Sequence, residues 1–256
     1  MDLPRRLESK VVLVTGGGTG IGRAVARRVA AEGAAVVIAG RRDDVGERAA
    51  GEIRSTGAEA LFVAADVTVE AEVAALVAAA VDRFGRLDGA FNNAGGVAVT
   101  APVPEVDGDG WAAELALNLT SVFHCLKAEI PAMRRSPAGG SIVNNASTGG
   151  VAGIPGLSAY VAAKHGVVGL TRSAALECAG DGVRVNALVT GNVDTPLYRR
   201  LSGAPIDGDA DLPAPNPTGR VASPDEIAGF VAYLLSDEAA FVTGAALAID
   251  GGATAG

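Results

Sequence analysis

Short, almost fully apolar runs alternate with longer amphipathic stretches along most of the chain. Seven runs have the length and aliphatic content that are typical of strands buried in a parallel sheet. They lie at residues 10–15, 34–40, 60–66, 87–93, 140–147, 183–189 and 245–250. The stretches between them repeat apolar residues at helical spacing. This pattern predicts helices over residues 20–32, 43–55, 70–84, 109–135, 158–179 and 224–236.

Repeated strand-helix alternation predicts an α/β fold. Parallel strands joined by right-handed crossovers form a doubly wound sheet of about seven strands with helices on both faces. One helix start is marked in the sequence, because Ser223 is a good N-cap and Pro224 suits the first helical position. In such a sheet, ligands bind beyond the carboxyl ends of the strands.

One region breaks the regular pattern. Residues 195–221 are rich in proline and include three aspartates in the run IDGDAD. We expect a substrate loop at about residues 192–220, because it follows the carboxyl end of a strand; a solvated insertion is the alternative. Its apolar residues Leu197, Tyr198, Leu201 and Ile206 suggest a substrate with an apolar ring or chain.

Composition narrows the function classes. The 256 residues are 49% hydrophobic and 20% charged, enough for one large core, so we expect a single domain over residues 1–256. The net charge of −8 argues against nucleic acid or an anionic membrane surface as a partner. Cys125, Cys178 and two histidines are too few for a disulfide framework or a metal site. Residues 1–10 lack the apolar stretch of a signal peptide, and no run is long enough to span a membrane, so we expect a cytoplasmic protein.

A glycine-rich loop follows the first predicted strand and opens a helix. In TGGGTGIG, at residues 15–22, the glycines allow a tight turn and close approach of backbone N–H groups to a pyrophosphate. The helix N-terminus adds partial positive charge, which explains how an acidic protein can bind an anion. Glycine-rich loops also occur as plain turns, but the order strand, loop, helix favours a dinucleotide site.

The end of the second strand bears on the choice of cofactor. An acidic residue there would bind the ribose 2′-hydroxyl of NAD, but Gly40, Arg41 and Arg42 occupy these positions. Arg41 offers a planar fork suited to a 2′-phosphate, and Arg42 is a second donor, so NADP is favoured over NAD. The alternative is that both arginines begin the next helix as solvated charges that pair with Asp43 or Asp44.

Polar residues also end the third and fourth strands. Asp66 closes one, and NNAG at residues 92–95 closes the other. Both are expected at the cofactor edge of the sheet, although the same residue types are common in turns for their local hydrogen bonds. We expect them to serve both purposes.

Three proton-handling side chains are predicted at the same edge. Tyr160 and Lys164 are four residues apart in a helical stretch and therefore project from one face. Taken alone, such a tyrosine is more often a core residue and such a lysine a solvated charge. Ser147, at the carboxyl end of the fifth predicted strand, changes that balance, because all three then converge on one cleft.

Together these motifs resemble those of the short-chain dehydrogenase/reductase family. TGGGTGIG, Asp66, NNAG, Asn118, Ser147 and the run YVAAK at residues 160–164 stand in the order and spacing of that family. The resemblance covers nearly the whole chain and is closest to the family's main group. It implies a Rossmann-like fold, an NAD(P)-dependent oxidoreductase and a homotetramer or dimer. The apolar outer faces of the helices predicted at 109–135 and 158–179 also favour self-association.

The resemblance also implies the roles of individual residues. Tyr160 is the catalytic acid/base, Lys164 holds the nicotinamide ribose and lowers the tyrosine pKa, and Ser147 orients the substrate oxygen. Asn118 supports a water relay; a packing asparagine with satisfied hydrogen bonds is the alternative. A free tyrosine titrates near about pH 10, so it needs nearby positive charge to act as a base at neutral pH. In all, we expect the cofactor to contact Gly16, Thr19, Gly20, Ile21, Gly22, Arg41, Arg42, Asp66, Val67, Asn93, Ala94, Gly95, Tyr160, Lys164, Gly191, Val193 and Thr195.

The sequence departs from the family after the sixth predicted strand. Thr190 stands where a proline usually precedes the glycine, here Gly191, so backbone rigidity beside the nicotinamide is open. The function expected overall is NADP-preferring interconversion of a ketone and a secondary alcohol. Two alternatives are a catalytically silent dinucleotide sensor and an epimerase or dehydratase on the same fold.

Overall fold

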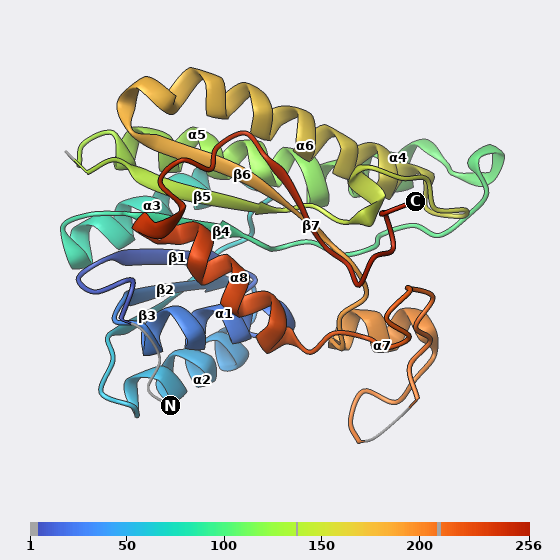
Figure 1. The fold of residues 1–256 in the computed structure, drawn as a ribbon, viewed down its shortest axis with the longest axis horizontal. Coiled ribbons are helices and arrows are strands. Elements are labelled where there is room, and N and C mark those ends of the chain that lie inside the picture. Colours follow the sequence, from blue (N-terminus) through green and yellow to red (C-terminus); the bar gives the residue numbers. More distant parts are fainter. Residues whose placement is uncertain (1–4, 137, 209–210) are drawn as a thin grey trace.

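A seven-stranded parallel sheet forms the centre of the molecule (Figure 1). The computed structural model describes residues 5–136, 138–208 and 211–256. Part of the N-terminal segment considered as a signal peptide and part of the IDGDAD run therefore lie outside the described residues. The strands run in the order β3-β2-β1-β4-β5-β6-β7, which confirms the predicted doubly wound fold. Their bounds are β1 Val11–Thr15, β2 Ala35–Gly40, β3 Ala60–Ala64, β4 Gly89–Asn92, β5 Gly140–Asn145, β6 Val183–Thr190 and β7 Ala246–Ile249.

Helices cover both faces of this sheet. On one face, α1 (Gly20–Ala31), α2 (Asp43–Arg54) and α8 (Pro224–Leu235) bury aliphatic side chains such as Val25 and Ile227. On the other, α3 (Glu70–Phe84), α5 (Ser121–Met133) and α6 (Ser158–Cys178) pack residues such as Leu76 and Val167. Strands buried from both sides read as continuous apolar runs, which is why the sequence pattern located them.

The ends of most elements follow from local chemistry. All strand ends lie within two residues of the predicted runs. The start of α8 is as predicted, with Pro224 in the first turn; the Glu226 carboxylate accepts a 2.9 Å hydrogen bond from the backbone N–H of Ser223. This capping box between Ser223 and Glu226 satisfies N–H groups that the helix itself leaves unpaired.

The long helix predicted at 109–135 is wrong in one respect, because the structure divides it into three parts. α4 covers Gly108–Leu115, a π-helical turn (η2) covers Ala116–Thr120, and α5 follows. The Asp107 side chain caps α4 by accepting a 2.7 Å hydrogen bond from the N–H of Gly110. The spacing of apolar residues does not reveal a single π-helical turn within an α-helix, because five residues are too few to establish a different period.

The segment predicted as a substrate loop contains a short helix, α7 (Pro196–Ser202). Thr195 caps it, since its Oγ1 accepts a 3.2 Å hydrogen bond from the N–H of Tyr198. Arg199 on α7 pairs with Asp194 and donates to the carbonyls of Pro205 and Gly208. The described part of this segment is thus tied to the end of β6. None of the helices in the described part of the chain is both long and apolar enough to cross a membrane.

Candidate active site

At the carboxyl edge of the sheet, hydrogen bonds join the ends of β1 and β4. Thr15 Oγ1, at the end of β1, accepts hydrogen bonds from the backbone N–H groups of Asn93 (3.0 Å) and Ala94 (3.1 Å). The Asn93 amide in turn donates to the backbone carbonyls of Thr15 (3.1 Å) and Gly16 (3.4 Å). The NNAG run therefore forms local hydrogen bonds that fix the start of the glycine-rich loop. This is one of the two roles expected for it; the other is contact with the cofactor.

The glycine-rich loop has the backbone that its sequence predicts. Gly16 and Gly20 have positive φ angles of 64° and 53°, which favour glycine. A Cβ atom at Gly22 would lie 2.3 Å from the carbonyl oxygen of Gly16, so the loop folds directly onto the first turn of α1. Thr19 is the N-cap of α1 and makes no side-chain capping bond, and the first turn carries no acidic residue. This helix start leaves backbone N–H groups for an anion, with Ile21 in the same turn.

Arg41 lies at the end of β2, beside open space. Its side chain is 71% exposed, and its Nη1 lies 3.7 Å from Oδ2 of Asp66. A side chain at the preceding Gly40 would meet no atom within 4 Å. Arg42 is exposed and forms the N-cap of α2. The sequence left open that Arg41 pairs with Asp43 or Asp44. In the structure, its ion-pair partner is Asp66 instead.

Asp66 is held by the residues that follow it. Its Oδ1 accepts from the backbone N–H (3.0 Å) and the hydroxyl (2.7 Å) of Thr68. Burial raises the pKa of Asp66, but these two hydrogen bonds and Arg41 together lower it below the ordinary value. The neighbouring Val67 is buried, and its carbonyl oxygen lies 3.2 Å from Nδ1 of His124.

Tyr160, Lys164 and Ser147 converge beside the end of β5. Tyr160 and Lys164 lie one turn apart in α6, with Lys164 Nζ 5.6 Å from the centroid of the Tyr160 ring. Lys164 is 5% exposed and donates a 2.8 Å hydrogen bond to the backbone carbonyl of Asn145, the last residue of β5. Ser147, two residues further on, accepts a 3.1 Å hydrogen bond from the N–H of Gly149 and lies close enough to Tyr160 to lower the pKa of its phenol.

Burial sets the proton affinities of this pair. Desolvation raises the pKa of Tyr160, the Ser147 hydrogen bond lowers it, and the negative charge of Glu114 raises it. Desolvation lowers the pKa of Lys164 to about 8, and Glu114 opposes that change. The tyrosine pKa was expected to lie below its ordinary value. In the protein without cofactor it lies above that value, because burial outweighs the other effects. A half-buried phenol that keeps its proton at neutral pH is suited to donate it.

Asn118 lies in the π-helical turn and is fully buried. Its Oδ1 accepts a 3.1 Å hydrogen bond from the N–H of Gly96, and its Nδ2 donates to the Gly96 carbonyl (2.9 Å) and to Glu114 Oε1 (2.6 Å). A Cβ at Gly95 would lie 2.8 Å from Asn118 Oδ1 and 3.7 Å from Lys164 Nζ. The side chain thus has the partners of a packing asparagine, while it lies beside the lysine.

At the end of β6, the residue that replaces the family's proline makes a hydrogen bond that proline cannot make. Thr190 Oγ1 donates to Asn145 Oδ1 (2.7 Å), and Asn145 Nδ2 donates to Asn93 Oδ1 (3.1 Å). The ends of β6, β5 and β4 are therefore linked through side chains. The next residue, Gly191, donates its N–H to the carbonyl of Ile249 on β7.

The residues after Gly191 bring α7 to the glycine-rich loop. Val193 is buried in the core and bridges to Ala222. A Cβ at Gly20 would lie 3.1 Å from Thr195 Cγ2, so the start of α7 contacts the loop before α1. Because the Val193 side chain is buried, only its backbone is available to a ligand, and its contact with the cofactor stays a prediction.

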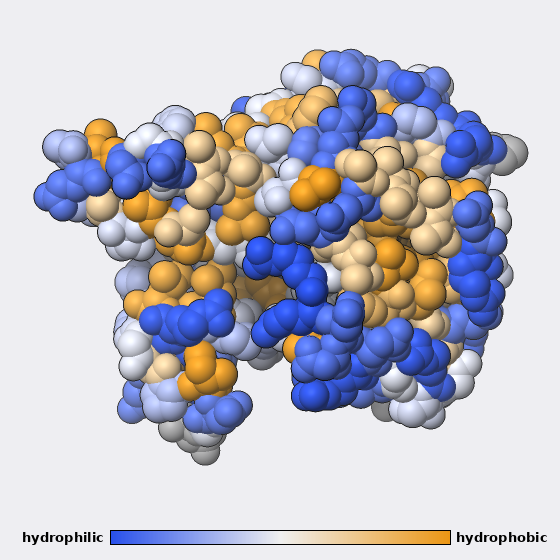
Figure 2. Space-filling model, turned by 180° about the vertical axis from the view of Figure 1, so that it is seen from behind, coloured by the Kyte–Doolittle hydropathy of each residue, from blue (hydrophilic) through white to orange (hydrophobic). Residues whose placement is uncertain are grey.

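A recess lies between two projecting parts of the molecule. The segment with α7 projects on one side, and the loops after β4 and β5, which bridge at Ala101 and Leu157, project on the other (Figures 1 and 2). Figure 2 shows hydrophobic residues in the depth of this recess. No group of three or more His, Cys, Asp or Glu side chains within the described residues is placed to hold a metal ion.

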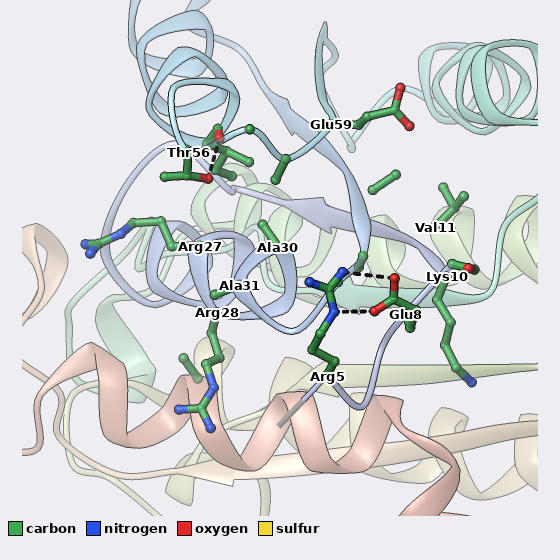
Figure 3. Close-up of a pocket in the computed structure, with 18 of the residues that line it drawn as sticks. Arg5, Glu8, Lys10, Val11, Arg27, Arg28, Ala30, Ala31, Thr56 and Glu59 are labelled. Carbon is green, nitrogen blue, oxygen red and sulfur yellow. Dashed lines mark hydrogen bonds and ion pairs between the residues drawn. The ribbon is translucent and has the colours of Figure 1, made fainter. Parts of the chain in front are cut away.

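A second hollow lies at the opposite, amino edge of the sheet. It is lined by charged residues, among them Lys10, Arg27 and the ion pair of Arg5 with Glu8 (Figure 3). None of the predicted site residues lines it. The chemistry of this hollow is therefore separate from the site at the carboxyl edge.

Sequence reasoning missed two residues of the site. Asn145 holds Lys164 through its backbone and joins Thr190 to Asn93 through its side chain. Glu114 is fully buried against Asn118. Glu114 could have been found from its position four residues before Asn118, which places both on one helical face. For Asn145 the signal was weaker: it is a polar residue at the end of a predicted strand, two residues before Ser147.

Comparison with known proteins agrees with this geometry. Residues 16–254 match the family model described as enoyl-(acyl carrier protein) reductase. A 2,5-dichloro-2,5-cyclohexadiene-1,4-diol dehydrogenase of Sphingobium indicum is 44% identical over 253 residues, covering 97% of this chain and 98% of the relative. The chain belongs to the short-chain dehydrogenase/reductase family.

Two further similarities point the same way. A cis-4-hydroxycyclohexanecarboxylate dehydrogenase of Sinomonas cyclohexanicum is 46% identical over 250 residues, covering 96% of this chain and 97% of the relative. The crystal structure of a levodione reductase superposes with a TM-score of 0.89 at 40% identity, covering 96% of this chain and 98% of that one. Members of this family use nicotinamide dinucleotides, and these relatives are named as dehydrogenases or reductases.

Proposed function

We propose that this protein interconverts a ketone and a secondary alcohol on a small cyclic substrate, with a nicotinamide dinucleotide as hydride carrier. The observation that carries the proposal is the convergence of Tyr160, Ser147 and Lys164 beside the carboxyl ends of the strands. The names of the dehydrogenase relatives support the reaction class and the cyclic substrate.

The described residues fit a dinucleotide. The start of α1 offers backbone N–H groups with no acid in its first turn, which suits a pyrophosphate. The phosphates would be held by the glycine-rich loop, at Gly16, Thr19, Gly20, Ile21 and Gly22. The adenosine half and its linkage would be held by the ends of β3 and β4, at Asp66, Val67, Asn93, Ala94 and Gly95. The nicotinamide half would be held by Gly191, Val193, Thr195, Tyr160 and Lys164.

NADP is the preferred cofactor in this proposal. Arg41 is exposed, its neighbour Gly40 leaves open space, and Arg42 lies next to it. A guanidinium binds phosphate with two parallel hydrogen bonds, and no acidic residue occupies the end of β2 to bind a free 2′-hydroxyl. Asp66, the partner of Arg41 across 3.7 Å, would help to orient the guanidinium.

The reaction needs one proton and one hydride. A bound nicotinamide dinucleotide supplies the hydride in reduction and accepts it in oxidation. In reduction, Tyr160 gives its phenolic proton to the carbonyl oxygen as the carbonyl carbon gains the hydride, and Ser147 donates a hydrogen bond to that oxygen. In oxidation, Tyr160 removes the hydroxyl proton, and the positive charge of Lys164 stabilises the phenolate. Asn118 supports the proton path from Lys164.

The substrate would enter the recess between α7 and the loops after β4 and β5. Leu201 and Ile206, in the proposed substrate loop at residues 192–220, are about half exposed. Apolar surface beside a polar reacting centre suits a ring that carries one oxygen function.

We further propose that residues 1–256 act as one oxidoreductase domain, that the protein is a homotetramer, and that it is cytoplasmic. Size-exclusion chromatography with light scattering tests the assembly.

A direct assay tests the function. Purified protein is incubated with NADPH or NADH and cyclic ketones, and with the oxidised cofactors and cyclic secondary alcohols, while nicotinamide absorbance is recorded. The proposal predicts turnover of at least one ketone-alcohol pair in both directions. Tight dinucleotide binding without turnover across the panel would favour a sensor, and product formation without net change in absorbance would favour an epimerase or dehydratase.

A further inference from the structure

A fully buried carboxylate lies next to the proposed catalytic residues without a role in the proposed mechanism. Glu114 is 0% exposed and is in the last turn of α4, where the π-helical turn begins. A buried carboxylate is costly unless hydrogen bonds compensate it. The partners of Glu114 therefore indicate what the fold gains from it.

Both carboxylate oxygens of Glu114 are used. Oε2 accepts hydrogen bonds from the backbone N–H groups of Ala98 (2.7 Å) and Val99 (3.0 Å), in the loop after β4. Oε1 accepts a 2.6 Å hydrogen bond from Asn118 Nδ2. One side chain thus fixes both the loop beside the recess and the amide that lies against Gly96.

The negative charge of Glu114 also reaches the reacting pair. It raises the pKa of Tyr160 and that of Lys164, whereas burial acts on the two groups in opposite directions. α6 packs against α4, η2, α5, β6 and the turns at Thr148–Gly150 and Ala179–Asp181. The other ionisable side chains in the described part of these elements are not among the causes of either pKa change; they are Asp109, His124, Cys125, Lys127, Glu129, Asp181 and Arg184.

We infer that Glu114 is a positioning residue of the active site, which holds Asn118 and the loop at Ala98–Val99 in place and sets a carboxylate beside the Tyr160–Lys164 pair. This inference rests on the proposed function, because it assigns a role relative to Tyr160 and Lys164. Alcohol oxidation needs the form of the pair with a phenolate beside an ammonium, which is a minor form because the pKa of Lys164 lies below that of Tyr160. A neighbouring negative charge favours the ammonium, and it also makes the first proton harder to remove from the pair.

The charge is tested by Glu114→Gln, which keeps the size of the side chain. Without the negative charge, the pair loses its first proton at lower pH, so the acidic limb of the kcat/KM profile for alcohol oxidation shifts down by about 0.5–1 pH unit. The plateau also falls, because less of the lysine is protonated in the working form. The matched control is Glu177→Gln, an exposed carboxylate on α6 about 25 Å along the helix from Tyr160; it keeps the wild-type profile.

A second readout does not depend on turnover. The chain has three tyrosines, so the ionisation of Tyr160 can be followed by ultraviolet absorbance as the difference between each protein and the same protein carrying Tyr160→Phe. We expect the midpoint to move to lower pH in Glu114→Gln and to stay in place in Glu177→Gln. An unchanged midpoint and an unchanged acidic limb in Glu114→Gln would overturn the electrostatic part of the inference.

The positioning part is tested by Glu114→Asp, which keeps the charge but shortens the side chain. Its acidic limb stays at the wild-type pH, while kcat falls by about tenfold with a smaller change in KM, because Asn118 and the loop lose their fixed geometry. A wild-type kcat in Glu114→Asp overturns this part, and the variant also provides the test if Glu114→Gln does not fold. Tyr160→Phe separates the two levels: if it stays active, the proposed function fails, whereas an inactive Tyr160→Phe with wild-type behaviour of both Glu114 variants refutes only this inference.

Discussion

Lys164 Nζ lies 5.6 Å from the centroid of the Tyr160 ring and donates a 2.8 Å hydrogen bond to the backbone carbonyl of Asn145. The last residue of β5 therefore fixes the position of the ammonium group beside the phenol ring. Thr190 and Asn93 hold the Asn145 side chain, so strand ends from across the sheet support the lysine.

Replacing Arg41 by alanine tests the cofactor preference. The guanidinium would bind the 2′-phosphate, and loss of a charge-assisted hydrogen bond costs about 1.5–3 kcal/mol. We expect kcat/KM with NADPH to fall by about tenfold or more, and kcat/KM with NADH to change much less. Arg48→Ala, at an exposed position of α2, is the matched control. Equal losses with both cofactors, or a wild-type preference for NADH, would refute the assignment.

Gly22 is predicted to tolerate no side chain. A Cβ there would lie 2.3 Å from the Gly16 carbonyl oxygen, so Gly22→Ala must displace the glycine-rich loop. We expect a loss of about 1–3 kcal/mol in the free energy of unfolding and weaker dinucleotide binding, measured by urea denaturation and by titration. The control is Gly51→Ala, inside α2, where the nearest atom is an arginine nitrogen 3.8 Å away. That variant is expected to be as stable as the wild type or more so; wild-type stability and binding in Gly22→Ala would contradict the packing argument.

Glu129 links stability to pH. It is fully buried on α5, and burial raises its pKa from 4.5 to about 7, although a 3.0 Å hydrogen bond from Asn92 Nδ2 opposes the rise. Because the folded protein holds this proton more tightly than the unfolded chain, the stabilisation is complete below pH 4.5 and is lost as the pH rises through about 7.

We therefore expect Glu129→Gln to remove part of the pH dependence of the unfolding free energy. Relative to the wild type, the variant gains stability between pH 5 and pH 8, on the order of 2–3 kcal/mol at most. Denaturant titrations over this range provide the measurement, with exposed Glu177→Gln as control. A constant difference between variant and wild type across the range would mean that Glu129 does not take up a proton on folding.

Much of the fold followed from the sequence because buried parallel strands and amphipathic helices leave strong patterns. The doubly wound seven-stranded sheet and the start of α8 at Pro224 agree with expectation. The π-helical turn at Ala116–Thr120 did not follow, because it depends on contacts of Asn118 with Gly96 and Glu114 rather than on periodicity. The helix α7 was missed because proline and glycine dominate its surroundings, whereas contacts of Arg199 with the flanking residues Asp194 and Gly208 hold it in place.

Part of the arrangement at the candidate site follows from the sequence. Strand ends and helical spacing predict Ser147, Tyr160 and Lys164 at one edge of the sheet, and the structure places Lys164 beside the Tyr160 ring there. The support beneath them was not predictable, since Asn145 and Thr190 meet only through the parallel pairing of β5 and β6. The effect of burial on Tyr160 was also missed, because a sequence does not give the desolvation of a particular phenol.

The central claim is that the Tyr160 hydroxyl transfers the proton. Tyr160→Phe removes that hydroxyl and keeps the ring that packs against Gly149. The decisive measurement is the single-turnover rate of ketone reduction in Tyr160→Phe and in the wild type, with the dinucleotide Kd determined for both. The account predicts a loss on the order of 10²-fold or more in rate with the Kd unchanged. A rate equal to that of the wild type would contradict it.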